Sequence, residues 1–294
     1  MGNKQSRVDS LSYIEEIVYS NTPGYWKTEE DLFETNEKAR RIIEVSGTVL
    51  DLKDVPIYKT PPSLCSRTEL VELDLSSNPL NQNFTEEMSQ LVNLKILNVR
   101  KCNFNSVPYG LSKICSLTKL NISRNNIGTS YSELSFLTNL EDLNLSGCRL
   151  DSFENLDSLL KLKKLNLSNN CFTESISCIG KLENLINLNM RKCKLLEWNI
   201  NIHKLVHLES LDISDNSLSS LNTIVDIKSL KVLNVEKNNI LGLENIDSLE
   251  SIEDLKLGLL KWNIIPESLV VLKNLRNLNM EAPLGVLQPI IFKI

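Results

Sequence analysis

The sequence predicts an α/β fold in which a short strand and its return segment recur many times, so that the strands form one parallel sheet in a solenoid. Three observations support this prediction. A motif of spaced leucines occurs ten times in succession, its copies lie 22 to 24 residues apart, and apolar and polar residues alternate inside each copy. Alternation is typical of a strand whose two faces differ, and a constant period of roughly 20 to 50 residues is typical of stacked repeats.

The repeated motif reads L-x-x-L-x-L-x-x-[N/C]-x-L. A degenerate copy, GTVLDLKDVPI, begins at Gly47, so that about 11 repeats extend over residues 47–294. The segments LNVRKCNF (97–104) and LNMRKCKL (188–195) are the same repeat position, four copies apart. The first positions of the ten regular copies are Leu70, Leu94, Leu117, Leu140, Leu162, Leu185, Leu208, Leu230, Ile252 and Leu275.

The alternation inside the motif assigns a side of the strand to each position. Leucines two residues apart point to one face, and the x residues between them point to the other. We therefore expect the leucines to form the core and the x residues to form an exposed parallel sheet. Because the return segments are bulkier than the strands, the stack should curve into a horseshoe with the sheet on its concave face.

The motif and its period resemble those of leucine-rich repeat proteins, and the resemblance covers about five sixths of the chain. Return segments with Val107-Pro108 and Ile265-Pro266 are similar to those of plant intracellular Ras-group and animal Ras-scaffold members. The 22-residue copies, such as LNTIVDIKSLKVL, resemble repeats of the protein phosphatase 1 regulatory subunit. The resemblance implies a non-catalytic interaction module whose partner is chosen by variable surface residues.

The ninth position of the motif is a structural ladder of Asn and Cys. The resemblance implies that this side chain points inward and bonds the backbone of neighbouring loops, where an unmet polar group would cost roughly 1 to 3 kcal/mol. Zinc binding by the cysteines is disfavoured, because alternate repeats hold them too far apart for Zn–S bonds of about 2.3 Å. The ladder consists of Asn78, Cys102, Asn125, Cys148, Asn170, Cys193, Asn216 and Asn238.

The amino-terminal region differs from the repeats. Residues 1–7 match M-G-x-x-x-[ST], which predicts N-myristoylation of Gly2 and at most reversible membrane contact, because one acyl chain binds weakly. Residues 8–46 contain apolar residues at helical spacing. We expect a helical cap over the first open core face; the alternative is a separate partner-binding helix.

Composition excludes several functions. The net charge of -5 and pI near 5.3 give no bulk attraction to nucleic acid. The sequence contains no apolar run of 18 residues, so no transmembrane helix is predicted. No signal peptide is evident, so we expect a cytoplasmic chain, peripheral on the cytoplasmic face of a membrane if acylated, with its seven cysteines reduced. His203 and His207 are the only histidines, and neither they nor another motif indicates catalysis, a metal, a cofactor or a small-molecule substrate.

Two features of the exposed sheet positions bear on function. The fifth position is mostly Asn, which we interpret as a scaffold device in which side chains on adjacent strands bond one another. Cations gather in the second to sixth repeats, which predicts a protein partner with an acidic surface, of the small GTPase or phosphatase class. The alternatives are a solvated strand face, a phosphatase regulatory subunit, or a lipid-anchored structural protein. The cations are Arg100, Lys101, Lys119, Arg124, Arg149, Lys164, Arg191, Lys192 and Lys194.

Overall fold

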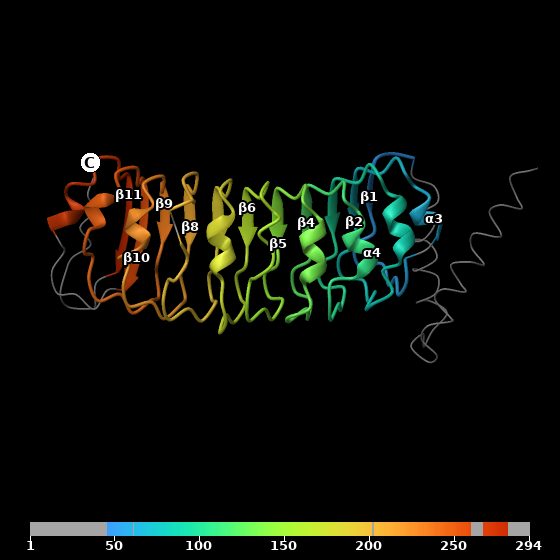
Figure 1. Cartoon of the computed structure of the whole chain (residues 1–294), viewed down its shortest axis with the longest axis horizontal. Helices are drawn as coiled ribbons and strands as arrows, with labels where there is room; N and C mark the ends of the chain where they lie inside the picture. The colour runs from blue at the N-terminus through green and yellow to red at the C-terminus, as the bar shows by residue number, and fades with distance from the viewer. Residues whose placement is uncertain (1–45, 61, 202, 260–266, 282–294) are drawn as a thin grey trace, which may run out of the picture. The chain divides into compact units, whose positions relative to one another are not determined.

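The computed structural model of the chain describes residues 46–60, 62–201, 203–259 and 267–281. The chain divides into two compact units, with the boundary between Leu140 and Glu141. In each unit one strand and one return segment alternate, and the strands follow one another in chain order (Figure 1). The predicted myristoylation segment (1–7) lies outside the described residues, and so does the predicted cap (8–46) apart from its last residue.

The described residues of unit 1 form four parallel strands that pair one repeat apart. The paired register places Leu50 opposite Leu73, and Leu97 opposite Leu120. All four side chains are at most 3% exposed, which places them in the core as the alternation predicts. The strands are β1 (Val49–Asp51), β2 (Glu72–Asp74), β3 (Ile96–Asn98) and β4 (Lys119–Asn121).

In the part of unit 2 that the structure describes, seven parallel strands pair with the same register of one repeat. Its regularity ends between β10 and β11, where the register shifts between Lys256 and Gly258, and Gly258 has a φ of 68°. The strands are β5 (Asp142–Asn144), β6 (Lys164–Asn166), β7 (Asn187–Asn189), β8 (Ser210–Asp212), β9 (Val232–Asn234), β10 (Asp254–Leu259) and β11 (Asn277–Glu281).

Most return segments in the described residues form a single turn of helix, and the segment between β5 and β6 forms none. The turn α4 starts after Val107-Pro108, and η4 is a 3₁₀ turn in a 22-residue copy. Their leucines, such as Leu111 and Leu134, are fully buried and close the core opposite the strands. The turns are α3 (Pro62–Cys65), η1 (Glu86–Gln90), α4 (Tyr109–Ser112), η2 (Ser132–Phe136), η3 (Ser177–Lys181), η4 (Ile224–Asp226), η5 (Ile246–Ser248) and η6 (Glu267–Leu269).

The turns after β1 to β9 use a left-handed backbone at the eighth motif position. This conformation costs a residue other than glycine roughly 1 to 2 kcal/mol, and Asn and Asp tolerate it best. In this protein basic residues stand at several of these positions, which presents their side chains beside the sheet. The eighth residues with positive φ are Asp54, Ser77, Lys101, Arg124, Gly147, Asn169, Lys192, Asp215 and Lys237.

Candidate partner-binding surface

The predicted basic residues of unit 1 lie together at β3, β4 and the turns that follow them. Lys119 is the first residue of β4, and Arg100 lies two residues after β3. The Lys101 N–H donates to the Ser123 carbonyl oxygen at 3.0 Å, so the turns after β3 and β4 are directly hydrogen-bonded. We call Arg100, Lys101, Lys119 and Arg124 the β3–β4 cluster.

The β3–β4 cluster is electrostatically uncompensated. None of its four cations forms an ion pair with a carboxylate in the described residues. Lys101 and Arg124 occupy the same position of adjacent repeats, in left-handed backbone with φ of 56° and 57°. Like charges on neighbouring strands repel, and basic residues are poor choices for this conformation. The positive charges of Lys101 and Arg124 are therefore held at a cost in the stability of the folded protein.

The side chains at the fifth motif position lie on the exposed face of the sheet. The structure differs from the expected bonding between strands, because most of these side chains bond their own backbone. Asn98 Oδ1 accepts the Arg100 N–H at 3.2 Å, and Asn121 Oδ1 accepts the Ser123 N–H at 3.1 Å. Two fifth-position asparagines of the described residues also donate to another repeat: Asn98 Nδ2 to Asp74 Oδ2 and Asn279 Nδ2 to Glu236 Oε1, each at 2.7 Å. The bond from the Arg100 N–H to Asn98 Oδ1, two residues away, fixes the backbone of the turn that carries Arg100.

Among the basic residues of unit 2, Lys164 and Arg191 have acidic neighbours. Lys164 of β6 pairs in register with Asp142 of β5, and opposite charges at paired positions are favourable. Arg191 Nε donates to Asp215 Oδ2 at 2.6 Å, and Lys237 Nζ lies 3.7 Å from Asp215 Oδ1. Arg191 is therefore already paired within the chain.

Asp215 is the residue that the sequence analysis missed. Its partial burial favours the neutral acid, but the hydrogen bond from Arg191 and the charges of Arg191, Lys237 and Lys192 outweigh this effect and keep the Asp215 pKa below its ordinary value. The available signal was the motif register, which places an acid at the eighth position one repeat after Arg191-Lys192. Arg149 and Lys194, at tenth positions with φ of 61° and 57°, are exposed.

The asparagines of the ninth-position ladder join successive repeats. Asn125 Oδ1 accepts the N–H groups of Cys102 at 2.9 Å and Phe104 at 3.0 Å, and its Nδ2 donates to the carbonyls of Val99 at 3.0 Å and Ile122 at 2.7 Å. Asn170 and Asn216 make the same set of bonds one repeat after Cys148 and Cys193. Asn78 and Asn238 each bond the preceding repeat.

The thiols of Cys102 and Cys193 only donate hydrogen bonds to the backbone, whereas the asparagine side chains both donate and accept them. The Cys102 thiol donates to the Leu75 carbonyl and the Cys193 thiol to the Leu167 carbonyl, each at 3.2 Å. Burial raises the pKa of both thiols to about 12, which keeps them protonated and unreactive. The residue after each cysteine takes a left-handed φ, as at Asn103, which distinguishes these turns from the asparagine turns.

Other candidate sites receive no support from the arrangement of side chains. In the described ranges no group of three or more His, Cys, Asp or Glu residues could hold a metal ion. His203 and His207 are both exposed on a return segment. Gly2 lies outside the described residues, and within the described part no helix is long and apolar enough to cross a lipid bilayer.

Comparison with known sequences identifies the repeat. A family model described as Leucine Rich Repeat matches residues 161–182 and 207–226, and a second, Leucine Rich repeat, matches residues 113–130. Protein flightless-1 homolog of Caenorhabditis elegans is 30% identical over 104 residues, which are 35% of this chain and 8% of that protein. The chain thus spans only a small part of that relative.

Comparison with solved structures supports the fold. An internalin (inlF) from Listeria monocytogenes aligns with a TM-score of 0.57 and 21% identity over 86% of this chain and 89% of that chain. The leucine-rich repeat ectodomain of the Arabidopsis receptor kinase HAESA aligns with a TM-score of 0.64 and 22% identity over 93% of this chain and 50% of that chain. The chain is therefore built of leucine-rich repeats that fold as a solenoid with parallel strands.

Proposed function

We propose that this protein is a non-catalytic interaction module in intracellular signalling, and that the β3–β4 cluster binds an acidic surface of a protein partner. Solenoids of this kind present an extended sheet face on which variable side chains meet a partner. The observation that carries the proposal is that the four cations of the β3–β4 cluster form no ion pair in the described residues, whereas Arg191 of unit 2 is paired with Asp215.

The physical reason lies in the interactions that each cation already makes before a partner binds. An arginine that already pairs with a carboxylate gains little from a partner's acid, because one interaction is exchanged for another. Unpaired, exposed cations keep their full attraction, steer encounter and set register. A protein-type ligand is supported by the structure of the HAESA ectodomain, which was solved in complex with a peptide hormone.

The test is charge reversal at the cluster, with a matched control. Lys101→Glu/Arg124→Glu should release the partner from the full chain in a quantitative affinity purification from cells. The control, Lys95→Glu/Lys273→Glu, makes the same change in net charge at two exposed lysines that are outside the cluster. Identical recovery of all partners by the wild type, the variant and the control would show that the cluster does not bind them.

Partner class follows from the resemblance of the return segments. Small GTPases and protein phosphatases are the two candidates, and a phosphatase regulatory subunit is the alternative function. A pull-down with purified GTPases in both nucleotide states tests the first. A change in phosphatase activity on addition of the purified chain tests the second, and it should disappear with Lys101→Glu/Arg124→Glu if the same surface is used.

Membrane association is a separate part of the proposal. Myristoylation of Gly2 would give weak, reversible binding to the cytoplasmic face of a membrane and leave a large cytoplasmic fraction. The mass of the amino-terminal peptide, together with fractionation of wild type and Gly2→Ala, tests this. An unmodified Gly2 would remove the membrane part of the proposal and leave partner binding unaffected, whereas Gly2-dependent membrane binding without any soluble partner would favour a lipid-anchored structural protein.

A further inference from the structure

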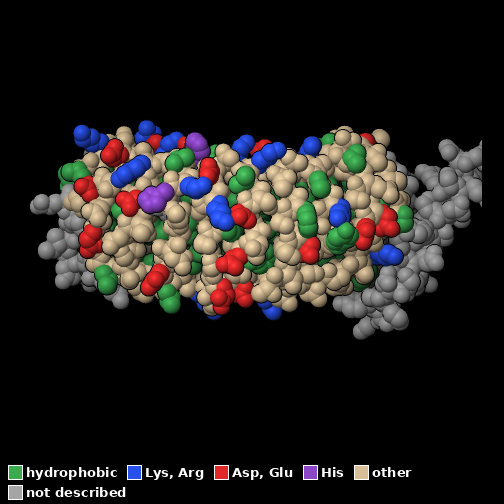
Figure 2. Space-filling view, viewed as in Figure 1, with side chains coloured by type: hydrophobic (Ala, Val, Ile, Leu, Met, Phe, Trp, Pro, Cys, Tyr) green, Lys and Arg blue, Asp and Glu red, His purple; other side chains and the backbone are tan. Residues whose placement is uncertain are grey.

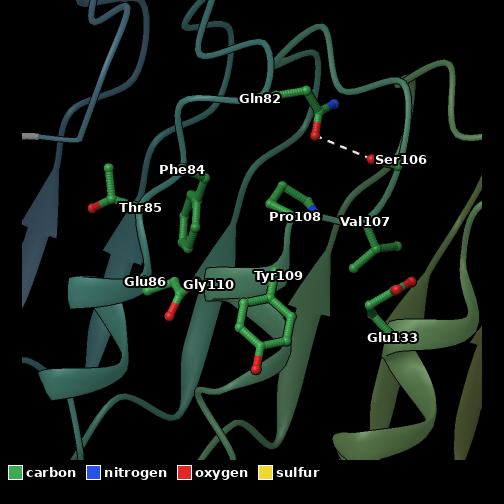
Figure 3. A pocket seen from close by; sticks show the side chains of 10 residues that line it. All are labelled: Gln82, Phe84, Thr85, Glu86, Ser106, Val107, Pro108, Tyr109, Gly110 and Glu133. Carbon is green, nitrogen blue, oxygen red and sulfur yellow. Dashed lines mark hydrogen bonds between the residues drawn. The ribbon is translucent and has the colours of Figure 1, made fainter.

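The return side of unit 1 carries an open pocket that lies apart from the sheet positions of the β3–β4 cluster. Its volume is about 440 Å³, within the range of about 300 to 1,000 Å³ that is usual for ligand pockets. The lining comes from three successive repeats, and Figure 3 shows the Tyr109 ring projecting between Glu86 and Glu133. The principal lining residues are Gln82, Phe84, Glu86, Pro108, Tyr109 and Glu133.

The pocket is held in shape by contacts that need no ligand. Phe84 is 3% exposed and meets the buried Phe104 edge to face, with ring centroids 6.3 Å apart. At Gly110 a side chain would overlap the Thr85 carbonyl oxygen, so glycine allows α4 to lie directly against the segment before η1. A ligand entering this pocket therefore orders few protein groups, which favours binding.

The rim combines two carboxylates with an exposed aromatic ring. Tyr109 is 51% exposed. Glu86 is exposed, and Glu133, whose Oε2 accepts the Ser132 hydroxyl at 3.0 Å, is half-buried. The face of an aromatic ring attracts cations, and carboxylates do the same. Since the β3–β4 cluster is basic, this rim has the opposite character.

The chain's own Lys113 shows that this surface holds a cation. Its Nζ lies 4.3 Å from the centroid of the Tyr109 ring and 5.8 Å from that of Phe136. A hydrogen bond with Tyr109 raises the Lys113 pKa, and the charge of Glu86 contributes in the same direction. Lys113 does not line the pocket, and in the described residues it forms no ion pair with Glu86 or Glu133.

We propose that this pocket binds a single basic side chain of a protein partner, with the aliphatic stem against Tyr109 and Pro108 and the charge beside Glu86 and Glu133. Arginine fits best, because a planar guanidinium both stacks on an aromatic ring and bonds a carboxylate through two N–H groups. The pocket therefore selects a basic segment, whereas the β3–β4 cluster selects an acidic one.

Titration of the full, ¹⁵N-labelled chain with N-acetyl-arginine amide, followed by NMR, tests the proposal. N-acetyl-citrulline amide is the control probe, because it keeps the shape of arginine and lacks its charge. We expect the arginine probe to bind about fivefold more tightly and to shift resonances of residues around Tyr109. Glu86→Gln/Glu133→Gln and Tyr109→Ala should each abolish that preference.

Two further variants separate this site from general charge effects. Glu174→Gln/Glu197→Gln removes two exposed carboxylates of unit 2 and should leave binding unchanged. Lys113→Gln should tighten binding about twofold, because it removes a repelling charge. Equal binding of both probes, equal loss in the control variant, or weaker binding by Lys113→Gln would overturn the proposal, the last because it would show that the charge of Lys113 does not repel the probe.

Discussion

Asn125 offers the most direct test of what holds successive repeats together. Its Oδ1 is the acceptor for the N–H groups of Cys102 and Phe104, and all three residues are at most 4% exposed. Asn125→Ala leaves both N–H groups buried without an acceptor. Each such group costs about 1 to 3 kcal/mol, so we expect a loss of about 2 to 6 kcal/mol in the free energy of unfolding.

Urea unfolding followed by circular dichroism measures the total loss, and hydrogen exchange locates it. The amide protons of Cys102 and Phe104 should exchange faster in Asn125→Ala. Cys102→Ala is the control, because it removes one weak thiol donor, to the Leu75 carbonyl, and should cost about 1 kcal/mol. A loss below 1 kcal/mol in Asn125→Ala, with both amides still protected, would refute the assigned role of the ladder.

Three further changes have defined outcomes. Lys101→Asn should raise the free energy of unfolding by up to about 1 kcal/mol in urea titrations, because Asn tolerates the φ of 56° better, while it weakens partner binding. Burial raises the pKa of Cys102 and Cys193 from 9.0 to about 12, so the unfolded chain loses these protons first. Stability should therefore fall between pH 9 and 12, by about 1.4 kcal/mol per pH unit for each thiol, and less steeply in Cys102→Ala. Gly110→Ala should lower the free energy of unfolding by about 1 to 3 kcal/mol, because the new methyl group meets the Thr85 carbonyl, and thermal unfolding measures this loss.

The candidate surface could be predicted only in part. The motif register places Lys101 and Arg124 at one position of adjacent repeats, and the structure brings their turns together. The motif register could not predict that Arg191 forms an ion pair with Asp215, because a register gives the position of a side chain and not its rotamer. The expected bonding between fifth-position asparagines was wrong for most of them for a similar reason: an Asn can bond its own backbone two residues on at lower entropic cost.

The sequence by itself determined the strands, their register and the inward leucines, because each repeat contacts its neighbours in a fixed order and the periodicity alone assigns every position. Only the tertiary structure decided how the return segments meet. The pocket beside Tyr109 depends on the close approach of α4 to Thr85 and on the positions of Glu86 and Glu133, so that three repeats together form its lining. The motif does not specify those residues, so their arrangement cannot be predicted from the period of the repeat. Contacts that vary from repeat to repeat are set by the packing of individual side chains, and these contacts give the protein the surfaces that we propose for binding.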